Sequence, residues 1–282
     1  MVGPVSPRPL AVLRDVPLSL PGCALTHVAR KPIDADRARA QHRGYAQALR
    51  DAGCDVLVLP ADEALPDCVF IEDLLVDLGP TRLLTAPGAP SRWAERDGVR
   101  AAFAPGGPLC GFGPLIEMPD GLRLDGGDVL AVRGVVFVGR STRTDSEAIA
   151  WLAAHCDAPV VPVNVRGALH LKTAVTPLCD RVLLADPEHV DLRPFMFFDI
   201  VCVAPGEAAA ANALRLPPRP DVRTTSFRDE RVLLPAGNPK TATTLRRWGI
   251  EVFEVEIDEL SKAEAGLTCM SVLLGAAFGP RP

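Results

Sequence analysis

Residues 124–144 read LDGGDVLAVRGVVFVGRSTRT, and an apolar run, Val129–Gly139, lies between two segments rich in glycine, charge and hydroxyl groups. A short run of Val, Leu and Phe bounded by turn-forming residues predicts a β-strand, and its continuous apolar character indicates burial on both faces. The same alternation recurs on both sides of this stretch. The sequence therefore predicts an α/β fold built from many short strands.

Further apolar segments bounded by proline or glycine are predicted as strands: Ala11–Arg14, Asp55–Pro60, Val69–Leu78, Arg82–Ala86, Val160–Val165, Val182–Ala185, Ile200–Ala204, Val232–Pro235, Glu251–Val255 and Thr268–Leu274. Fewer helices interleave, and they are predicted over Asp34–Ala52, Asp145–His155, Thr241–Trp248 and the alanine-rich Glu207–Leu214. A helix followed by a surface connection is predicted between Ala86 and Leu122. A strand–strand–helix–strand rhythm of roughly 50–60 residues can be traced five times along the chain, which suggests a repeated unit.

Composition excludes several classes of protein. The 282 residues are 48% hydrophobic and 23% charged, as in ordinary packed domains, and the net charge of -5 comes without any run of basic residues, so we expect no nucleic-acid partner. No apolar stretch reaches the roughly 18 residues of a membrane-spanning helix. Met1–Arg14 does not resemble a signal peptide, and the eight scattered cysteines contain no C-x-x-C pair. We therefore expect a cytoplasmic protein with reduced thiols.

Two residues are candidates for nucleophilic chemistry. Cys269 lies near the end of an apolar strand, and a thiol with an ordinary pKa of about 8.5 needs a base or a positive field to become a thiolate. His170, in Leu-His-Leu-Lys-Thr, has the type of side chain that moves protons in such a reaction. The alternatives are a buried inert thiol, since Cys269 is one of eight cysteines, and a packed core histidine between leucines.

Carboxylates occur in two unusual settings. Asp125 and Asp128 flank a Gly-Gly pair, which is typical of a turn but also lets the backbone approach a functional side chain closely. Asp67 and Asp73 are six residues apart, so in an extended segment both would point to the same side. Acids entering an apolar segment need a partner, which is either a cationic ligand or an internal arginine.

Two arginines lie in turn contexts: Arg92 in Pro-Gly-Ala-Pro-Ser-Arg at 87–92, and Arg143 in Gly-Arg-Ser-Thr-Arg-Thr at 139–144. A guanidinium offers a planar fork of N–H donors that matches a carboxylate. Each arginine is therefore either a carboxylate-binding group or a surface charge.

These segments, taken together and in order, resemble the dimethylarginine dimethylaminohydrolases of the guanidine-modifying, amidinotransferase-like superfamily. The matching stretches are LPADEALPDCVFIED at 59–73, PGAPSR at 87–92, LDGGDV at 124–129, FVGRSTRT at 137–144, LHLKT at 169–173 and LTCMS at 267–271. The resemblance runs from about residue 25 to residue 276. It implies the pentein fold, a five-bladed ββαβ propeller with the active site in the central channel, and one catalytic domain over residues 1–282.

The resemblance also implies a reaction. Cys269 would attack the guanidinium carbon of an Nω-methylated arginine, His170 would move the protons, and Asp125 would orient His170. The products would be citrulline and dimethylamine or methylamine, released through a covalent thiouronium intermediate, and no cofactor or metal is required. A zinc ion held by Cys269 and His170 is conceivable because both are ligand types, but the chain has no four-ligand set with structural-site spacing.

Seven residues are implied to surround the substrate: Asp67, Glu72, Asp73, Arg92, Arg143, Ala29 and Ala263. Asp73 and Glu72 would hold the guanidinium and Asp67 the α-ammonium group. The two arginines would bind the α-carboxylate. Ala29 stands where some relatives carry leucine in a lid loop, so this position bears on how the substrate fits.

Two other functions are compatible with the resemblance. An arginine deiminase would act on unmethylated arginine or another guanidine, but such chains are usually longer and differ around Ile71-Glu72. A non-catalytic arginine-binding protein of the same fold is the other alternative, and the three competent residue types at the catalytic positions argue against it. The expected partner is a small molecule, bound by a monomer or a homodimer without nucleic acid or membrane.

Overall fold

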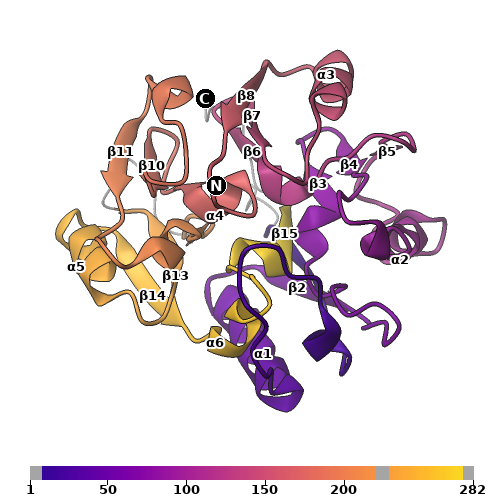
Figure 1. Ribbon diagram of the computed structural model, residues 1–282, viewed down its shortest axis with the longest axis horizontal. Coiled ribbons are helices and arrows are strands. Elements are labelled where there is room, and N and C mark those ends of the chain that lie inside the picture. Colours follow the sequence, from indigo (N-terminus) through magenta and orange to yellow (C-terminus); the bar gives the residue numbers. More distant parts are fainter. Residues whose placement is uncertain (1–7, 220–228, 276–282) are drawn as a thin grey trace, which may run out of the picture.

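The computed structural model describes residues 8–219 and 229–275. In this part of the chain the strands form five sheets of three strands each, arranged around a common centre (Figure 1). The strands are β1 (Leu10–Arg14), β2 (Asp55–Leu59), β3 (Leu75–Asp77), β4 (Arg82–Leu84), β5 (Leu115–Glu117), β6 (Val129–Val132), β7 (Val135–Arg140), β8 (Val160–Asn164), β9 (Val175–Pro177), β10 (Val182–Ala185), β11 (Asp199–Cys202), β12 (Leu214–Arg215), β13 (Arg231–Pro235), β14 (Glu251–Val255) and β15 (Ser271–Leu274).

All five sheets share one topology. In each sheet one outer strand pairs antiparallel with the middle strand, and the other outer strand pairs parallel with it. A parallel pair needs a crossover, and in four sheets an α-helix provides it. These helices are α1 (Ala35–Asp51), α2 (Glu95–Phe103), α3 (Ser146–His155) and α5 (Pro239–Arg247), and Figure 1 shows them around the outside of the ring. The fourth sheet has the 3-10 turn η5 (Arg193–Phe195) instead. The arrangement is the predicted five-bladed ββαβ propeller, and each sheet with its crossover is called a blade below.

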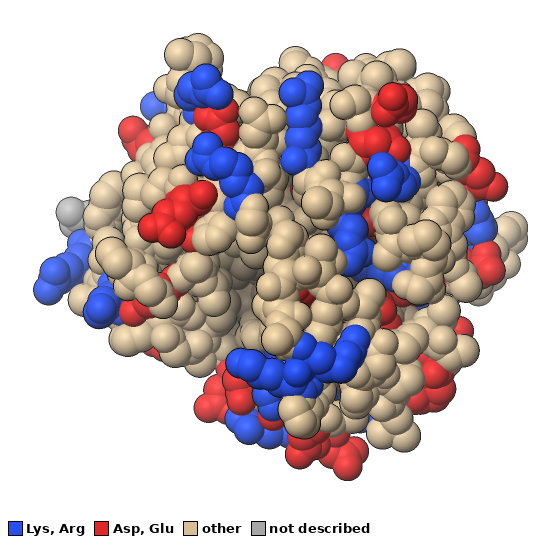
Figure 2. All heavy atoms as spheres, in the orientation of Figure 1, with Lys and Arg blue, Asp and Glu red and all other residues tan. Residues whose placement is uncertain are grey.

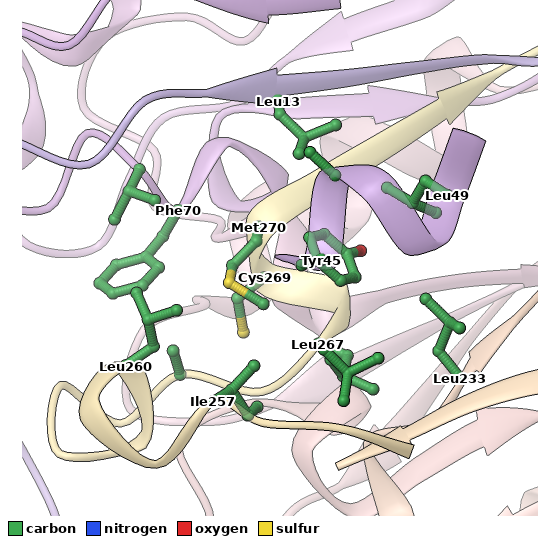
Figure 3. Close-up of a cluster of buried hydrophobic side chains, with 14 of the residues drawn as sticks. Leu13, Tyr45, Leu49, Phe70, Leu233, Ile257, Leu260, Leu267, Cys269 and Met270 are labelled. Carbon is green, nitrogen blue, oxygen red and sulfur yellow. The ribbon is translucent and has the colours of Figure 1, made fainter. Parts of the chain in front are cut away.

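The last strand closes the ring. β15 pairs antiparallel with β1, with Leu10 opposite Leu274 and Leu13 opposite Ser271. One blade therefore contains the first and the last described strands of the chain. The segment just before β15 contributes Leu267, Cys269 and Met270 to the core cluster drawn in Figure 3.

The helix α1 forms for the reasons that its sequence indicates. Asp34 is the N-cap and its carboxylate accepts a hydrogen bond from the Arg37 N–H at 3.0 Å, while Gly53 follows the helix with a φ of 95°. Tyr45 and Leu49 are buried on one face, and Figure 3 shows both within the apolar cluster that also contains Cys269. The Tyr45 hydroxyl also forms a hydrogen bond of 2.6 Å with Ser271 Oγ in β15, which fixes α1 against the closing strand.

Several predicted elements need correction. Val129–Gly139 is two strands, β6 and β7, separated by a turn at Arg133 and Gly134 in which both residues have positive φ. Val69–Leu78 is not one strand, since it contains the 3-10 turn η2 (Ile71–Asp73) before β3. Glu207–Leu214 is the short 3-10 turn η6 (Ala208–Ala211) rather than a helix, because so short a segment gains too few hydrogen bonds to pay for nucleation.

The strand predicted over Thr268–Leu274 begins only at Ser271, and Thr268–Met270 form the 3-10 turn η8. Between Ala86 and Leu122 the predicted helix is α2, but the connection after it also forms the short strand β5. Two short α-helices, α4 (Leu171–Ala174) and α6 (Asp258–Ser261), and the 3-10 turns η1 (Leu20–Gly22) and η3 (Pro90–Arg92) lie in the connections. Across residues 8–219 and 229–275, no helix combines the length and apolar character needed to cross a membrane.

Candidate active site

A pocket lies among loops that come from different blades. Its lining residues are Ala24, Asp67, Phe70, Asp73, Arg92, Arg143, Leu169, His170, Ala263, Glu264, Ala265 and Cys269, around an empty volume of about 350 Å³ that is partly open to solvent. Figure 2 shows a hollow near the middle of one face of the molecule, with basic and acidic side chains interspersed around it. The two candidate reactive residues, His170 and Cys269, therefore face one cavity although 99 positions separate them in sequence.

His170 is held between two buried carboxylates. Its Nε2 lies 2.8 Å from Asp125 Oδ2, and its Nδ1 lies 3.6 Å from Asp73 Oδ1. Burial alone would lower the pKa of His170, but the charges of Asp73 and Asp125 outweigh it and raise the pKa to about 9. His170 is therefore an imidazolium at neutral pH, with a proton to donate.

The Gly-Gly pair brings the backbone close to this histidine. Gly126–Asp128 form the 3-10 turn η4, and a Cβ atom on Gly127 would lie 2.5 Å from His170 Nδ1 and 2.8 Å from Asp73 Oδ1. The Gly127 N–H also donates to Asp73 Oδ1 at 3.1 Å. Glycine is required here because any side chain would occupy the space of the imidazole.

Asp128, the second carboxylate of this motif, does not line the pocket. It is completely buried, and burial raises its pKa to about 6. Its Oδ1 accepts from the N–H of Leu171, the residue after His170, at 2.8 Å, and its Oδ2 accepts from Ser141 Oγ at 2.5 Å and Thr144 Oγ1 at 2.6 Å. Asp128 thus ties the histidine segment to the loop that carries Arg143.

Cys269 is in η8, directly before β15. Its side chain is among the buried residues of the apolar cluster (Figure 3). The Gly266 backbone nitrogen lies 3.4 Å from its sulfur. Burial raises the pKa of the Cys269 thiol, and the nearby carboxylates of Glu72 and Asp73 raise it further. In the protein without substrate, Cys269 is therefore a protonated thiol at neutral pH.

We expect Cys269 to be alkylated by iodoacetamide much more slowly at pH 7 than the exposed Cys110, and its rate to keep rising above pH 9. The reason is that only the thiolate reacts and its formation is disfavoured by burial and by two carboxylates. Peptide mass spectrometry after timed labelling at pH 6–10 measures both rates in one sample. Equal rates at pH 7 would contradict the prediction.

The three predicted acids lie in different places. Asp67 lines the pocket, its carboxylate accepts from the Ala24 N–H at 3.1–3.2 Å, and burial raises its pKa. Asp73 also lines the pocket, and the charges of His170 and Arg92 lower its pKa in spite of burial. Glu72 is not among the lining residues. It lies behind the wall, with Oε1 2.6 Å from Lys172 Nζ and Oε2 accepting from Thr268 Oγ1 at 2.8 Å.

The two predicted arginines both line the pocket, but their guanidinium groups have different partners. Arg92 is buried, and its guanidinium donates to Asp73 at 2.5 Å and to both carboxylate oxygens of Glu95 at 3.0 and 2.9 Å. Its positive charge is thus paired with the internal carboxylates of Asp73 and Glu95, and its hydrogen bond holds Asp73 in place. Arg143 donates to Thr26 Oγ1 at 2.7 Å, and its Nη1 is 3.9 Å from Asp125. Of the two, Arg143 has the guanidinium with fewer internal partners at the pocket.

The loop before α1 is held over one side of the pocket by a residue that the sequence did not indicate. Glu264 lines the pocket, and its carboxylate accepts from three consecutive backbone N–H groups: Thr26 and Val28, each at 2.8 Å, and His27. Ala29 follows in this loop and is exposed, outside the set of lining residues, whereas Ala263 lines the pocket. No local pattern marks Glu264, because its partners are more than 230 residues away in the chain.

Among the described residues, one group of side chains has the spacing of a metal site: Asp73, Asp125 and His170, with ligand atoms within 4.8 Å of one another. The carboxylate oxygens of this group already accept hydrogen bonds. Asp125 accepts from the Gly88 N–H at 2.6 Å and from His170, while Asp73 accepts from Gly127 and Arg92. We therefore assign the group to ion pairing and to orienting His170.

Comparisons with known proteins show which proteins this chain is similar to. The family model described as N,N dimethylarginine dimethylhydrolase, eukaryotic, matches residues 27–192. The N(G),N(G)-dimethylarginine dimethylaminohydrolase of Pseudomonas aeruginosa is 33% identical, with 89% of this chain and 93% of the relative covered. The enzyme of that name from Streptomyces coelicolor is 37% identical, with coverage of 89% and 91%.

Solved structures point the same way. The structure of the P. aeruginosa enzyme, as a cysteine-to-serine mutant complexed with citrulline, superimposes with a TM-score of 0.81 at 29% identity, covering 94% of this chain and 98% of the other. The N-terminal domain of ArgZ, covalently bound to a reaction intermediate, has a TM-score of 0.79 at 18% identity, covering 96% of this chain and all of the other, and shows the shared fold.

Proposed function

Since this chain belongs to the dimethylarginine dimethylaminohydrolase family, we propose that it is a hydrolase that converts Nω-methylated arginines to citrulline and dimethylamine or methylamine. One observation carries the proposal. A cysteine, and a histidine paired with a carboxylate, line the same pocket, whose walls also supply acids for a cationic substrate. Family membership and this constellation both support the proposed chemistry.

The proposed substrate has a guanidinium at one end and an α-ammonium and an α-carboxylate group at the other. The pocket has a group of opposite charge for each of the three. Asp73 and Asp67 are acids on the wall that suit the guanidinium and the α-ammonium group, and Arg143 suits the α-carboxylate. Glu72 does not contact the guanidinium of the substrate, because its own carboxylate binds Lys172 and Thr268. It affects substrate binding only by holding these two neighbours in place. Arg92 contributes by holding Asp73 in place.

The first half of the reaction forms the covalent intermediate. The approaching cation favours loss of the Cys269 proton to solvent, because it offsets the carboxylates that keep the thiol protonated. The thiolate attacks the guanidinium carbon and a sulfur–carbon bond forms. The bond from this carbon to the methylated nitrogen then breaks as the His170 imidazolium donates its proton to the departing amine.

The second half releases citrulline. His170 is now neutral and accepts a proton from water, whose oxygen attacks the thiouronium carbon. The sulfur–carbon bond breaks and Cys269 leaves as a thiolate. The hydroxyl group left on the carbon gives its proton to solvent and becomes the carbonyl oxygen of citrulline. Asp125 holds the imidazole in one orientation through both halves, as the carboxylate of other catalytic triads does.

The test is citrulline release by the purified protein from asymmetric dimethylarginine, monomethylarginine and arginine, assayed side by side with Cys269→Ala as the control. Release from the methylated substrates that is lost in the variant supports the proposal. Release from arginine alone would make the protein a deiminase. Release from none of the three would overturn the proposed substrate class and leave the fold standing.

Gly127→Ala is expected to lower kcat by about 100-fold, since a displacement of roughly 1 Å of a catalytic group has an effect of this size. The added methyl group would collide with His170 Nδ1 and Asp73 Oδ1. Steady-state kinetics at saturating substrate measure the loss.

The matched control for this variant is Gly44→Ala. Gly44 is exposed on α1, and a methyl group there would meet no atom within 4 Å. This change should leave kcat unchanged and stabilise the helix by about 0.5–1 kcal/mol. Wild-type turnover in Gly127→Ala would mean that the tight approach of this backbone to His170 has no role in catalysis.

A further inference from the structure

Asn212 connects the two segments that carry the candidate catalytic residues. It follows the turn η6, its side chain is buried, and it does not line the pocket. Its Nδ2 donates to the backbone carbonyl of Lys172 at 2.8 Å and to Thr268 Oγ1 at 3.1 Å, and its Oδ1 accepts from the Thr268 N–H at 2.9 Å. One buried amide thus bonds to two chain segments that lie 96 residues apart (172 and 268).

The two residues bonded by the Asn212 amide lie next to the two candidate catalytic residues. Lys172 is two residues after His170, in the short helix α4, and Thr268 is directly before Cys269, in η8. Gly266 packs against the amide as well, since a Cβ there would be 2.3 Å from Asn212 Cγ, and the Gly266 N–H is the group that contacts the Cys269 sulfur. The bridge therefore holds the histidine segment and the cysteine segment at a set separation.

A second path joins the same segments and completes a closed ring of polar contacts. The Thr268 hydroxyl accepts from Asn212 and donates to Glu72 at 2.8 Å, and Glu72 pairs with Lys172 Nζ at 2.6 Å. The Asn212 amide donates into both paths and the Glu72 carboxylate accepts from both, so each contact in the ring pairs a donor with an acceptor. Buried rings of this kind are rigid when every member is satisfied and weak when one member is lost.

We infer that Asn212 is a positioning residue for the reaction, setting the distance between Cys269 and His170 without contacting substrate; this inference rests on the proposed function. The amide is chemically required. An aspartate in its place keeps an oxygen for the Thr268 N–H but turns an acceptor toward the Lys172 carbonyl, so the link to the histidine segment becomes repulsive.

The test compares Asn212→Asp with Asn238→Asp. Asn238 is the matched control because it is also buried, and its Nδ2 also donates to a backbone carbonyl, that of Pro235 at 2.8 Å, beside α5 and away from the pocket. We expect Asn212→Asp to lower kcat by about 10- to 100-fold while KM changes less than about threefold, because the catalytic groups move and the binding groups do not. Asn238→Asp should leave both constants unchanged.

Covalent labelling of Cys269 by 2-chloroacetamidine supplies a readout that does not depend on turnover. Asn212→Asp should slow this labelling by a similar factor, whereas labelling of the exposed Cys110 by iodoacetamide should not change. If the wild-type protein releases no citrulline but the labelling of Cys269 still falls in Asn212→Asp, the proposed function fails and the positioning role stands. Wild-type kcat and labelling in Asn212→Asp, or an equal loss of kcat in Asn238→Asp, would overturn the inference.

A second pair of variants covers the case in which Asn212→Asp does not fold. Thr268→Val removes the hydroxyl that links Asn212 to Glu72, while Thr268→Ser keeps it. We expect slower labelling of Cys269 in Thr268→Val and labelling at the wild-type rate in Thr268→Ser. Equal labelling in the two variants would count against the ring as the positioning element.

Discussion

Cys269→Ala is expected to lower kcat for citrulline release by at least about 10⁴-fold, because removal of a catalytic nucleophile leaves only the rate that binding and charge stabilisation provide. No other cysteine can take its place, since Cys269 is the cysteine among the residues that line the pocket. The side chain lies within an apolar cluster, so alanine suits the site and the fold should persist. Substrate binding should persist as well, because the acids and Arg143 are untouched.

Cys179→Ala is the matched control for this prediction. Cys179 is a buried cysteine that is 8% exposed, as against 7% for Cys269, and it packs in a different core cluster, away from the pocket. Its replacement should leave kcat unchanged. Initial-rate assays together with equilibrium binding of substrate distinguish loss of chemistry from loss of binding. Residual turnover within about 100-fold of wild type in Cys269→Ala would show that another group carries the attack.

Asp125→Asn is expected to lower kcat by about 10³- to 10⁴-fold, the scale seen when a triad carboxylate becomes an amide. Both oxygens of Asp125 accept hydrogen bonds, one from the Gly88 N–H at 2.6 Å and one from His170 at 2.8 Å. An amide has a single oxygen, so its NH₂ group must face one of these two donors. The imidazole then loses either its charge partner or its orientation.

The same variant should change the titration of His170. Asp73 and Asp125 together raise the His170 pKa to about 9, so removing one charge lowers this pKa and leaves less imidazolium at pH 8. NMR titration of the histidine ring protons measures the shift. Asp186→Asn is the matched control, because Asp186 pairs with His189 at 2.8 Å at a site outside the pocket lining. A His170 pKa unchanged by Asp125→Asn would contradict the assigned pairing.

The strands that could be predicted from sequence are those with enough apolar residues to form a run. Val182–Ala185 and Glu251–Val255 are observed with the predicted bounds. Three short strands, β5, β9 and β12, were missed because two or three residues carry no periodicity, and they form only because a neighbouring strand offers a free edge. Pairing with a neighbouring strand in the folded protein, rather than the local sequence preference, determines that these segments form strands.

The site shows the same division between local and long-range information. Asp67 and Asp73 both line the pocket, as their six-residue spacing suggested, but the segment between them consists of turns, with Asp73 in η2, rather than an extended strand. The turn context of Arg92 gave no sign of its burial, although Glu95, three residues later, is one of the acids that hold it. Glu264 and Asn212 act on segments far away in the chain, and no single-sequence pattern reports such contacts.

The closing of the ring by β15 has a consequence for the newly made protein. Of the described strands, β1 is synthesised first and β15 last, so a nascent chain contains His170, Asp125 and most of the pocket residues before η8 and Cys269 are made. We expect Cys269, the proposed nucleophile, to take its place at the pocket when β15 pairs with β1. Under the proposed mechanism, a chain truncated before η8 would hold Asp67 and Asp73 without the thiol and would release no citrulline.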